Sequence, residues 1–596
     1  MSRLKAILAI GLTLAVLLIL PSNVVNDAKA VSVFGPVSLG ITGGETGIAV
    51  NPTNASNAVI FNPFTNTASQ IAMYTRDDGA TWHAGTSTTA VPGATSDPDV
   101  TVDSSGNFYI SGFFNSSNQN VRHYLYKSSD GGVTWNFLST PVFSSSSVVA
   151  LPGGGTANVC KSTPGVLLYD FPKIIADRTA TSPYKNNLYF LSSLLELNTT
   201  ATACQNVSTD LATVFRSTDG GATWVGGQAF SRAQFSAFGG EKPVTVTADG
   251  AVLITSFVPG SGICISANGG IVVTRSVDGG RTYSSSCIYN NPTTGSVSNP
   301  ILGVGLGTGD IAAGYGTDSV ISVMGCVSSC GTSMAINHFF VLSSANDGAT
   351  WTTAPVRVDD AQSPDNIQFP LGSPQPTLRP EPGPAVSMSS ANGRVDVAWY
   401  DHRNGNSTLA DVYTSYSNNN GASFATNIRI TPQAGCIADR CLTGADDFLG
   451  IDSSTRWSYL SYFFPLGGTV AYFARVDLAD FSISANPASV TINKGIPSSP
   501  TINITLMSMN GFAGTITLTG SPMYSDPTQG PLFRFFPVNI TLSSGSSGTS
   551  TMHFYVCKST PDKTYTFTVI GTSGPLVHSS TVKVTVTGNT GGICQL

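Results

Sequence analysis

The chain has 596 residues, of which only 10% are charged, and its formal net charge is −6. A net negative charge gives no basic footprint, so we do not expect a nucleic-acid partner. The length exceeds what one ordinary core supports, and a composition rich in Gly and poor in charges favours short strands and turns over long helices.

The N-terminal segment, residues 1–30, has the features of a secretory signal peptide. Two basic residues precede an apolar run from 6 to 20, and Ala28-Lys29-Ala30 offers a cleavage site before Val31. The run is short for a membrane span, and no later apolar stretch is long enough to cross a bilayer. We therefore expect a protein that is secreted or held at the cell surface. An uncleaved membrane anchor is the alternative.

Six copies of an eight-residue pattern follow. Each copy has Ser or Thr at its first position, Asp or Asn at the third, Gly at the fifth, Thr or Ser at the seventh and an aromatic residue at the eighth. The copies end at Trp82, Trp135, Trp224, Tyr283, Trp351 and Phe424. The acid or amide can accept hydrogen bonds from backbone N–H groups of a tight turn, and the Gly can adopt positive φ without a Cβ penalty. We predict a structural role for these acceptors, which are Asp77, Asp130, Asp219, Asp278, Asn346 and Asn419.

This octapeptide resembles the Asp-box, or BNR, repeat of the sialidase-like β-propellers, and the resemblance covers about Val31 to Asp477. It implies an all-β propeller over residues 31–478. Strand-like runs recur four to a repeat, which is the content of one blade. Three further strands follow the sixth turn, and the N-terminal segment VSVFGPVSLG can supply their fourth partner. We predict seven blades, with six, the number found in sialidases, as the alternative.

The catalytic residues of sialidases do not carry over. Those enzymes grip a sialic-acid carboxylate with three arginines, the first from a Phe-Arg-Ile-Pro motif. The segment before the first blade, VFGPVSLGITGGETG, contains no arginine. Arg122, Arg379 and Arg403 do not match the positions of the three sialidase arginines clearly enough to carry the triad over. Propellers with these turns include hydrolases, lectin-like binders and receptor ectodomains, so the repeat leaves the activity open.

Carboxylates precede or open the first strand of six of the seven predicted blades. In an up-and-down blade these positions lie opposite the octapeptide turns, around the central channel. Converging like charges cost energy unless a cation or a proton relieves them, so a Ca²⁺ site is one interpretation. Paired carboxylates for glycoside hydrolysis are a second, and hydrogen bonds to converging backbone N–H groups are a third. The metal candidates are Glu45, Asp97, Asp99, Asp446 and Asp447, and the catalytic candidates are Asp170, Glu241, Glu381 and Asp401.

The motif AWYDHRNGNS provides the strongest single group of polar residues on this side. It ends a predicted second strand at Tyr400 and opens a loop with Asp401. Its side chains offer donors and acceptors for a sugar or a peptide, although at most two of three consecutive residues can face the channel. The alternative is an Asp401–Arg403 pair that stiffens the loop. The ligand-binding candidates are Tyr400, His402, Arg403, Arg122 and His123.

Ten cysteines in an exported chain predict disulfides. Zinc binding would need closer clusters with histidines nearby. Seven Asn-x-Ser/Thr sequons are compatible with a glycoprotein. The local spacing favours the pairs Cys160–Cys204, Cys264–Cys287, Cys326–Cys330, Cys436–Cys441 and Cys557–Cys594.

Residues 479–596 have a different texture, with seven short strand-like runs separated by turn signals from Phe481 onward. This pattern predicts an Ig-like β-sandwich. It resembles the accessory domains appended to secreted enzymes and surface proteins, and it contains no catalytic cluster.

Three functions fit the sequence. The first is a glycan- or protein-binding module that uses an acidic face of the propeller, with or without a divalent cation. The second is a glycoside hydrolase of sialidase-like fold that uses paired carboxylates at the channel rim. The third is a purely structural component of the cell envelope.

Overall fold

The structure is a computed structural model that describes residues 31–42, 46–62, 70–90, 95–116, 120–138, 148–150, 156–158, 167–196, 211–230, 243–258, 263–296, 299–302, 309–314, 317–328, 338–361, 384–389, 392–406, 409–436, 449–463, 470–494 and 500–588. Contacts divide the chain into two compact units, of which one is Val31–Leu478 and the other contains Ala479–Leu596. Among the described residues every regular element is a β-strand. No helix there is long and apolar enough to span a membrane.

The first unit is built from four-stranded antiparallel sheets that follow one another along the chain, here called blades. Blade 1 contains β2 (Gly47–Val50), β3 (Ala58–Phe61), β4 (Met73–Thr75) and β5 (His83–Ala84). Blade 2 contains β7 (Thr95–Val102), β8 (Phe108–Ser116), β9 (Asn120–Ser128) and β10 (Thr134–Leu138), with β6 (Thr86–Ser87) alongside β10. Blade 3 contains β13 (Leu167–Ala176), β14 (Leu188–Glu196), β15 (Leu211–Ser217) and β16 (Val225–Phe230), and β11 (Val148–Ala150) pairs with β12 (Thr156–Asn158) in the segment before it.

The remaining blades have the same design. Blade 4 contains β17 (Val244–Val246), β18 (Val252–Val258), β19 (Gly270–Ser276) and β20 (Ser284–Asn290). Blade 5 contains β22 (Gly309–Ala313), β23 (Val320–Ser328), β24 (Phe339–Ser344) and β25 (Val356–Arg357), with β21 (Ile301–Leu302) also on β23. Blade 6 contains β26 (Ala385–Met388), β27 (Val395–Asn406), β28 (Leu409–Ser417) and β29 (Ile428–Arg429), with β30 (Gly435–Cys436) also on β28. Blade 7 contains β31 (Gly450–Ser453), β32 (Trp457–Phe463), β33 (Val470–Asp477) and β1 (Ser32–Thr42).

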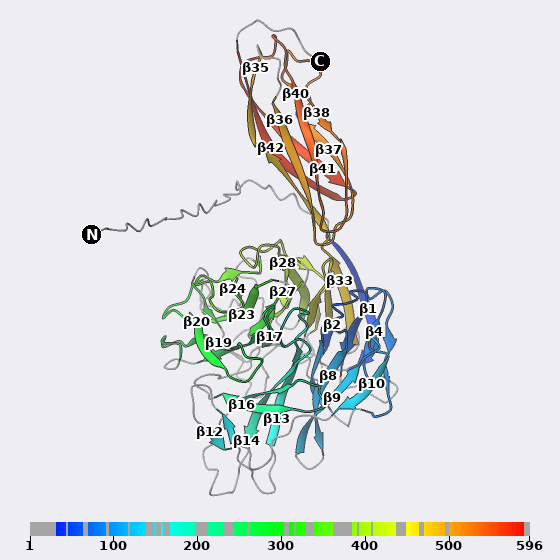
Figure 1. The fold of residues 1–596 in the computed structure, drawn as a ribbon, viewed down its shortest axis with the longest axis vertical. Coiled ribbons are helices and arrows are strands. Elements are labelled where there is room, and N and C mark those ends of the chain that lie inside the picture. Colours follow the sequence, from blue (N-terminus) through cyan, green and yellow to red (C-terminus); the bar gives the residue numbers. More distant parts are fainter. Residues whose placement is uncertain are drawn as a thin grey trace, which may run out of the picture. The chain divides into compact units, whose positions relative to one another are not determined.

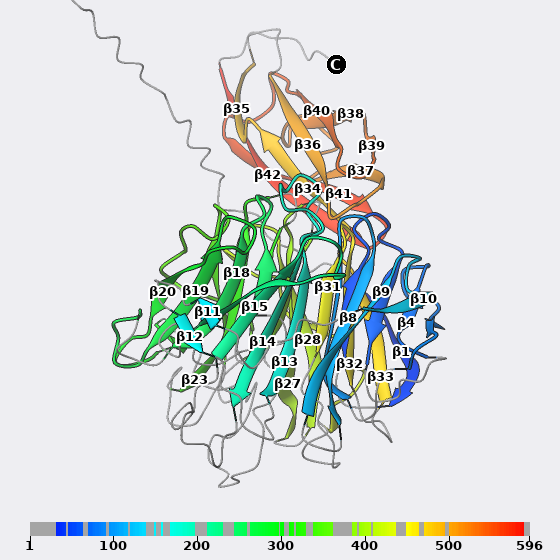
Figure 2. The same cartoon turned by 60° about the horizontal axis from the view of Figure 1, so that its bottom comes forward.

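The blades form a closed ring. The first strands of successive blades contact one another in chain order, and the first strand of the last blade contacts that of the first; these strands are β2, β7, β13, β17, β22, β26 and β31. Figure 1 shows the sheets following one another around a common centre, from blue through green to yellow. In Figure 2 their long strands run side by side. This arrangement of the described sheets favours seven blades over six.

The two ends of the first unit meet in blade 7. Strand β1 pairs antiparallel with β33, from Ser32 opposite Asp477 to Thr42 opposite Val470, which is the partner predicted for the N-terminal segment. Because blade 7 combines strands from both ends of the sequence, no turn joins its third and fourth strands. This explains why the octapeptide occurs in six copies.

The octapeptides are the turns between the third and fourth strands of blades 1–6, and each predicted acceptor residue accepts a backbone hydrogen bond within its turn. In blade 1 the Asp77 Oδ1 atom accepts a hydrogen bond from the Thr81 backbone N–H (2.9 Å), and Thr75 Oγ1 accepts one from Gly79 (2.9 Å). The amides of Asn346 and Asn419 accept the equivalent bond in blades 5 and 6. These bonds stabilise the charged form of the acids, because the side chain and backbone of Thr81 lower the pKa of Asp77 to about 2.

The core of the ring lies between neighbouring blades. One cluster joins blades 1 and 2 through Val59, Phe61, Val100 and Tyr124, which are fully buried. Equivalent clusters lie between blades 3 and 4, 4 and 5, 5 and 6, 6 and 7, and 7 and 1. Because strand side chains alternate between the two faces of a sheet, each blade contributes to the core on both sides. This accounts for the apolar character of the middle strands.

The second unit is a two-layer β-sandwich with one apolar core. One sheet has the order β34 (Asp480–Asn486), β36 (Thr501–Met509), β40 (Ser547–Tyr555) and β38 (Leu532–Phe536). The other has the order β35 (Ser489–Asn493), β42 (Leu576–Thr587), β41 (Thr564–Ser573), β37 (Gly514–Ser521) and β39 (Asn539–Leu542).

The expectation of seven strands in this unit is wrong, since its described residues alone form nine. The run that begins at Phe481 is divided at Pro487 into β34 and β35, which belong to different sheets. Proline lacks the N–H that a continuous ladder needs. The additional strand β38 has the sequence LFRFF, which does not alternate clearly between apolar and polar residues.

Candidate functional site

Polar side chains on the first strands join neighbouring blades. The Asp99 carboxylate on β7 accepts a hydrogen bond from the Ile174 N–H on β13 (2.7 Å). In the same way Asp310 accepts one from Val386 (3.1 Å), and Asp452 accepts one from Val50 (2.7 Å). Each bond satisfies an inner-edge N–H group that has no strand partner on that side. The contacts of Asp99 therefore agree with the third interpretation, in which backbone N–H groups of converging strands bind the acid.

Most of the predicted channel-rim residues lie outside the described part of the chain. These residues are Glu45, Glu241, Glu381, Asp446 and Asp447. The structure places the backbone of four others in strands but does not describe their side chains: Asp97 in β7, Arg122 in β9, Asp170 in β13 and His402 in β27. Their predicted roles stay predictions. In the described part, no group of three or more His, Cys, Asp or Glu residues could hold a metal ion.

Two predicted ligand-binding residues are buried in separate places. His123 on β9 packs against Phe190 of blade 3, with 4.9 Å between the ring centroids. Tyr400 on β27 is 4% exposed, and its hydroxyl donates to the Phe463 carbonyl of blade 7 (3.3 Å). The structure therefore brings neither side chain to Arg403, which faces blade 5.

Asp401 and Arg403 are brought together. The expected loop at Asp401 is wrong, because β27 continues as a strand to Asn406. Residues two apart on a strand share a face, and here Arg403 donates to the Asp401 Oδ2 atom through Nε (2.9 Å) and Nη2 (2.7 Å). The Asp401 side chain is fully buried and also accepts a hydrogen bond from the Trp399 indole N–H (2.8 Å). Asp401 thus holds Arg403 and does not itself reach the surface.

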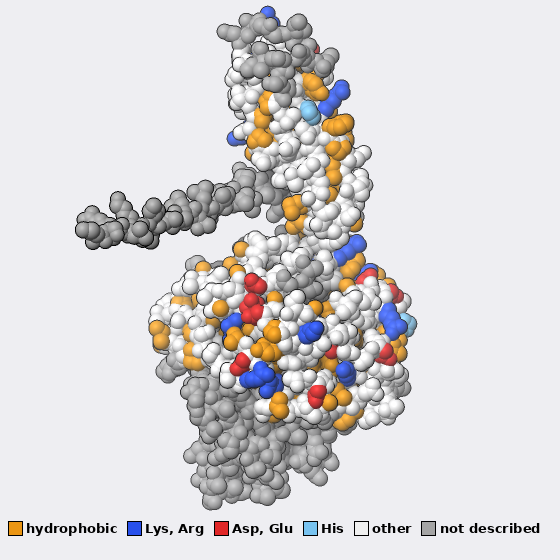
Figure 3. Space-filling view, in the orientation of Figure 1, with side chains coloured by type: hydrophobic (Ala, Val, Ile, Leu, Met, Phe, Trp, Pro, Cys, Tyr) orange, Lys and Arg blue, Asp and Glu red, His pale blue; other side chains and the backbone are white. Residues whose placement is uncertain are grey.

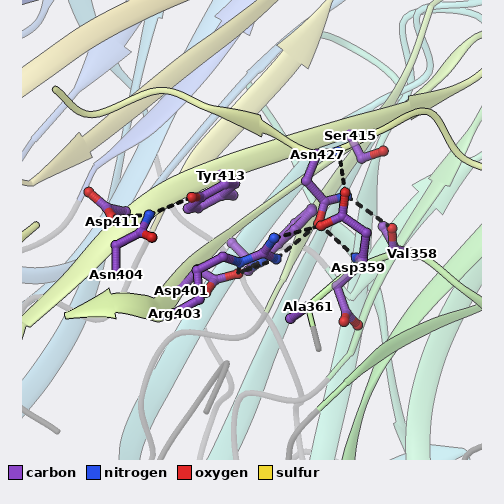
Figure 4. Close-up of polar contacts among 12 residues, drawn as sticks. Val358, Asp359, Ala361, Asp401, Arg403, Asn404, Asp411, Tyr413, Ser415 and Asn427 are labelled. Atoms are coloured by element: carbon purple, nitrogen blue, oxygen red, sulfur yellow. Dashed lines mark hydrogen bonds and ion pairs between the residues drawn. The ribbon is translucent and has the colours of Figure 1, made fainter. Parts of the chain in front are cut away.

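Residues from blade 5 and the outer strand of blade 6 complete the contacts of Arg403. Its Nη1 atom donates to Asp360 Oδ1 (2.5 Å), and its Nη2 atom donates to Asn427 Oδ1 (2.9 Å). Asp360 and Asn427 also bind each other's backbone N–H groups (2.9 and 2.8 Å). Figure 4 shows Arg403 between Asp401 on one side and Asn427 on the other. The guanidinium is therefore fixed by three side chains from three segments.

An aromatic ring supports the same guanidinium. The Arg403 Cζ atom lies 4.4 Å from the centroid of the Tyr413 ring, which stacks in turn on Trp399. Asn404 donates to the Tyr413 hydroxyl (2.6 Å) and to Asp411 (3.1 Å), contacts that are visible in Figure 4. Cation–π contacts of this kind add to the hydrogen bonds that hold an arginine.

Two further ion pairs flank this centre. The Asp411 carboxylate accepts hydrogen bonds from Arg429 (2.8 Å) and Thr431 (2.6 Å). On the blade 5 side, Asp359 accepts hydrogen bonds from Arg357 (2.7 Å) and lies 2.9 Å from the His338 ring nitrogen. Every described carboxylate of this cluster is thus paired with an arginine.

The electrostatics follow from these pairings. Burial opposes the charged forms, but the hydrogen bonds and charge of Asp401, followed by those of Asp360, raise the pKa of Arg403 further above its ordinary value. For Asp359 burial also opposes ionisation, yet the His338 and Arg357 contacts hold its pKa below the usual value. Burial raises the pKa of the Tyr413 hydroxyl. Arg403 is therefore permanently charged, and Tyr413 stays neutral at physiological pH.

We call the solvent-facing part of this cluster the blade 5–6 edge, which consists of Asp360, Arg403, Asn404, Asn427 and Arg429. Asp360, Asn404 and Arg429 are exposed, and the other two are partly exposed. The edge lies away from the octapeptide turn, because Asp401 pairs with Asp411 at the far end of the β27–β28 ladder from Val395 and Ser417. It presents fixed hydrogen-bond donors and acceptors and contains side chains of both charge signs. Figure 3 likewise shows acidic and basic side chains interspersed on the visible face of the first unit.

Only part of this edge could be predicted from the sequence. The AWYDHRNGNS motif contains Arg403 and Asn404, but Asp360, Asn427 and Arg429 come from distant segments. The adjacent acids Asp359 and Asp360 could have drawn attention in a chain with only 34 acids. Nothing in the local pattern pairs them with Arg403.

One predicted disulfide is confirmed, between Cys264 and Cys287. Cys557 is also disulfide-bonded. The predicted pairs Cys160–Cys204, Cys326–Cys330, Cys436–Cys441 and Cys557–Cys594 each include a residue outside the described part, so these pairings stay predictions.

A closed ring of four-stranded sheets with octapeptide turns between the third and fourth strands is the sialidase-like propeller fold. The first unit has this fold. No family model and no curated protein matches the chain.

Several solved structures are similar at the level of fold. The α-L-arabinanase of Penicillium chrysogenum has 14% identity and a TM-score of 0.38, over 65% of this chain and 94% of that chain. A Trypanosoma rangeli sialidase has 10% identity and a TM-score of 0.35, over 93% and 91%. The xylan β-1,4-xylosidase of Bacillus halodurans has 9% identity and a TM-score of 0.30, over 85% and 94%.

Proposed function

We propose that this protein is an exported binding protein that engages a neutral glycan through the blade 5–6 edge. The observation that carries the proposal is the fixed position of Arg403, which is bound by Asp401, Asp360 and Asn427 and stacked on Tyr413. A site whose polar groups are already held in place loses little entropy when a ligand binds.

The charge of the edge supports a neutral ligand. Asp360 and Asp401 contact Arg403, while Asp411 contacts Arg429, so the charges largely cancel locally. A sugar presents hydroxyl groups that donate and accept, and the edge offers both kinds of partner through Asn404, Asn427 and Asp360. An anionic sugar would gain less, because each arginine here already contacts a carboxylate.

Burial favours binding over catalysis at this edge. Asp401, the predicted catalytic residue, is enclosed by Trp399 and Arg403 and has no exposed surface. A general acid or nucleophile must reach the reacting atoms. Asp401 is therefore a positioning residue for Arg403.

A glycan array and a hydrolysis screen test the proposal with the full chain. We expect binding to a neutral glycan without turnover, and about a tenfold loss of affinity in Asn404→Ala, since a lost hydrogen bond between neutral groups costs about 0.5–1.5 kcal/mol and about 1.4 kcal/mol is a factor of ten. Arg403→Lys should weaken binding as well, because a lysine cannot reproduce the planar contacts. Arg281→Ala is the control, since Arg281 lies in the octapeptide turn of blade 4 and stacks on Tyr184.

The other outcomes distinguish the alternatives. Hydrolysis of a glycan would contradict the proposal and favour Glu241, Glu381 or Asp170 as catalytic residues. Binding that EDTA abolishes, and that Asn404→Ala leaves unchanged, would also contradict it and favour a Ca²⁺ site at the predicted rim acids. If the substitutions alter neither binding nor hydrolysis, the structural envelope role would be favoured.

A further inference from the structure

A mostly buried arginine joins two blades that are not neighbours. Arg178 lies two residues after the end of the first strand of blade 3, and its Nη1 and Nη2 atoms donate to the Oδ2 (2.9 Å) and Oδ1 (3.2 Å) atoms of Asp452. Asp452 lies on β31, the first strand of blade 7. The Arg178 side chain is 12% exposed and that of Asp452 is 4% exposed.

The order of the blades places this pair across the ring. Blades 1 and 2 separate blade 7 from blade 3 in one direction, and blades 4, 5 and 6 separate them in the other. A direct contact between their innermost parts must therefore cross the channel. It lies toward the octapeptide side, because Asp452 is near the end of β31, next to the turn that leads into β32.

Asp452 also holds the blades on both sides of blade 7. Its carboxylate accepts hydrogen bonds from the Val50 N–H of blade 1 (2.7 Å) and from the Ser387 hydroxyl of blade 6 (2.9 Å). Four blades therefore converge on one carboxylate. With the guanidinium of Arg178 in place, this buried charge is compensated.

Blade 7 is where such a contact has the most effect. Its outer strand β1 comes from the other end of the unit, so the described residues close the ring there through hydrogen bonds and packing. The β1–β33 ladder also has two register shifts, between Phe34 and Val37 and between Ser38 and Thr42. An interrupted ladder has fewer bonds to resist separation.

We propose that Arg178 is a cross-ring lock that keeps the propeller closed at blade 7. Arg178 acts through Asp452, and the two residues together hold blades 3 and 7 in position. This role goes beyond the proposed binding function and does not depend on it.

The test compares the full chain with a version in which closure is made covalent. Ser38→Cys with Tyr472→Cys places two cysteines at directly paired positions of β1 and β33. Arg178→Met should lower the melting temperature of the first unit by about 5–10 °C, because it removes the positive charge that compensates the buried Asp452 carboxylate. With the disulfide formed, the same substitution should lower the melting temperature by less than half as much.

A matched control separates closure from local packing. Arg275 donates to the Asp347 carbonyl (2.9 Å) and joins the adjacent blades 4 and 5. Arg275→Met should lower the melting temperature by the same amount with and without the disulfide. If Arg178→Met prevents folding, Arg178→Lys replaces it in both backgrounds. An Arg178 loss that the disulfide does not reduce, or no loss at all, would overturn the proposal.

Discussion

Single residues of the octapeptide show how far local sequence determines this structure. Asp at the acceptor position in blades 1–4 and Asn in blades 5 and 6 make the same bond to the backbone four residues later. The shared acceptor atom explains why either residue fits. These roles could be predicted because each turn contains all the atoms that stabilise it.

The next position of the turn allows a prediction about pH. Asp347 has a positive φ of 53°, and burial, followed by the charges of Asp249 and Asp318, raises its pKa to about 6. A raised pKa means that the folded state favours the protonated acid. Its stabilising contribution is complete below about pH 4 and is lost as the pH rises through 6.

Asp347→Asn should therefore raise the melting temperature at pH 7.5 by a few degrees and have little effect at pH 4. Asparagine suits the backbone, since Asn420 occupies the same position in blade 6 with φ 55°. Thermal unfolding at both pH values measures the effect. The control is Asp78→Asn in blade 1, where the carboxylate accepts a hydrogen bond from Tyr459 (3.1 Å). An equal gain at both pH values would contradict the account.

Among the structural elements, the strands were predicted more reliably than their ends. The third and fourth strands of blades 1–6 follow from the octapeptide between them. The extension of β27 to Asn406 did not, because Gly405 and three polar residues before it are typical of a loop. Contacts from Asp360 and Asn427 hold this segment, and such long-range contacts leave no local pattern.

Tight packing between blades gives a prediction at the same scale. A Cβ atom on Gly348, whose φ is +73°, would lie 2.0 Å from Leu253 Cδ2 in blade 4. Gly348→Ala should destabilise the protein by about 2–4 kcal/mol, since it combines backbone strain with overpacking. Gly40→Ala, at φ +68° with nothing within 4 Å of its Cβ, should cost about 1 kcal/mol. Equal losses in denaturant unfolding would show that the turn does not pack as described.

At the scale of the whole molecule, ring closure by β1 could be predicted because three strands of blade 7 lacked a partner. The contact between Arg178 and Asp452 could not be predicted, since the two residues are 274 positions apart. Among the contacts of Arg403, only the one with Asp401, two residues away, could be predicted. The candidate site was found in part for the same reason. Arg403 belongs to a conspicuous motif, whereas its partners become neighbours only after the blades have assembled.

The proposed function of the whole molecule depends on binding of a neutral glycan at the blade 5–6 edge. It is tested most directly by titrating one glycan selected on the array into the wild-type chain, Asn404→Ala and Arg281→Ala. Asn404→Ala should bind this glycan about tenfold more weakly than the wild-type chain, and Arg281→Ala should bind it equally well. Equal affinities of all three proteins would contradict the proposal.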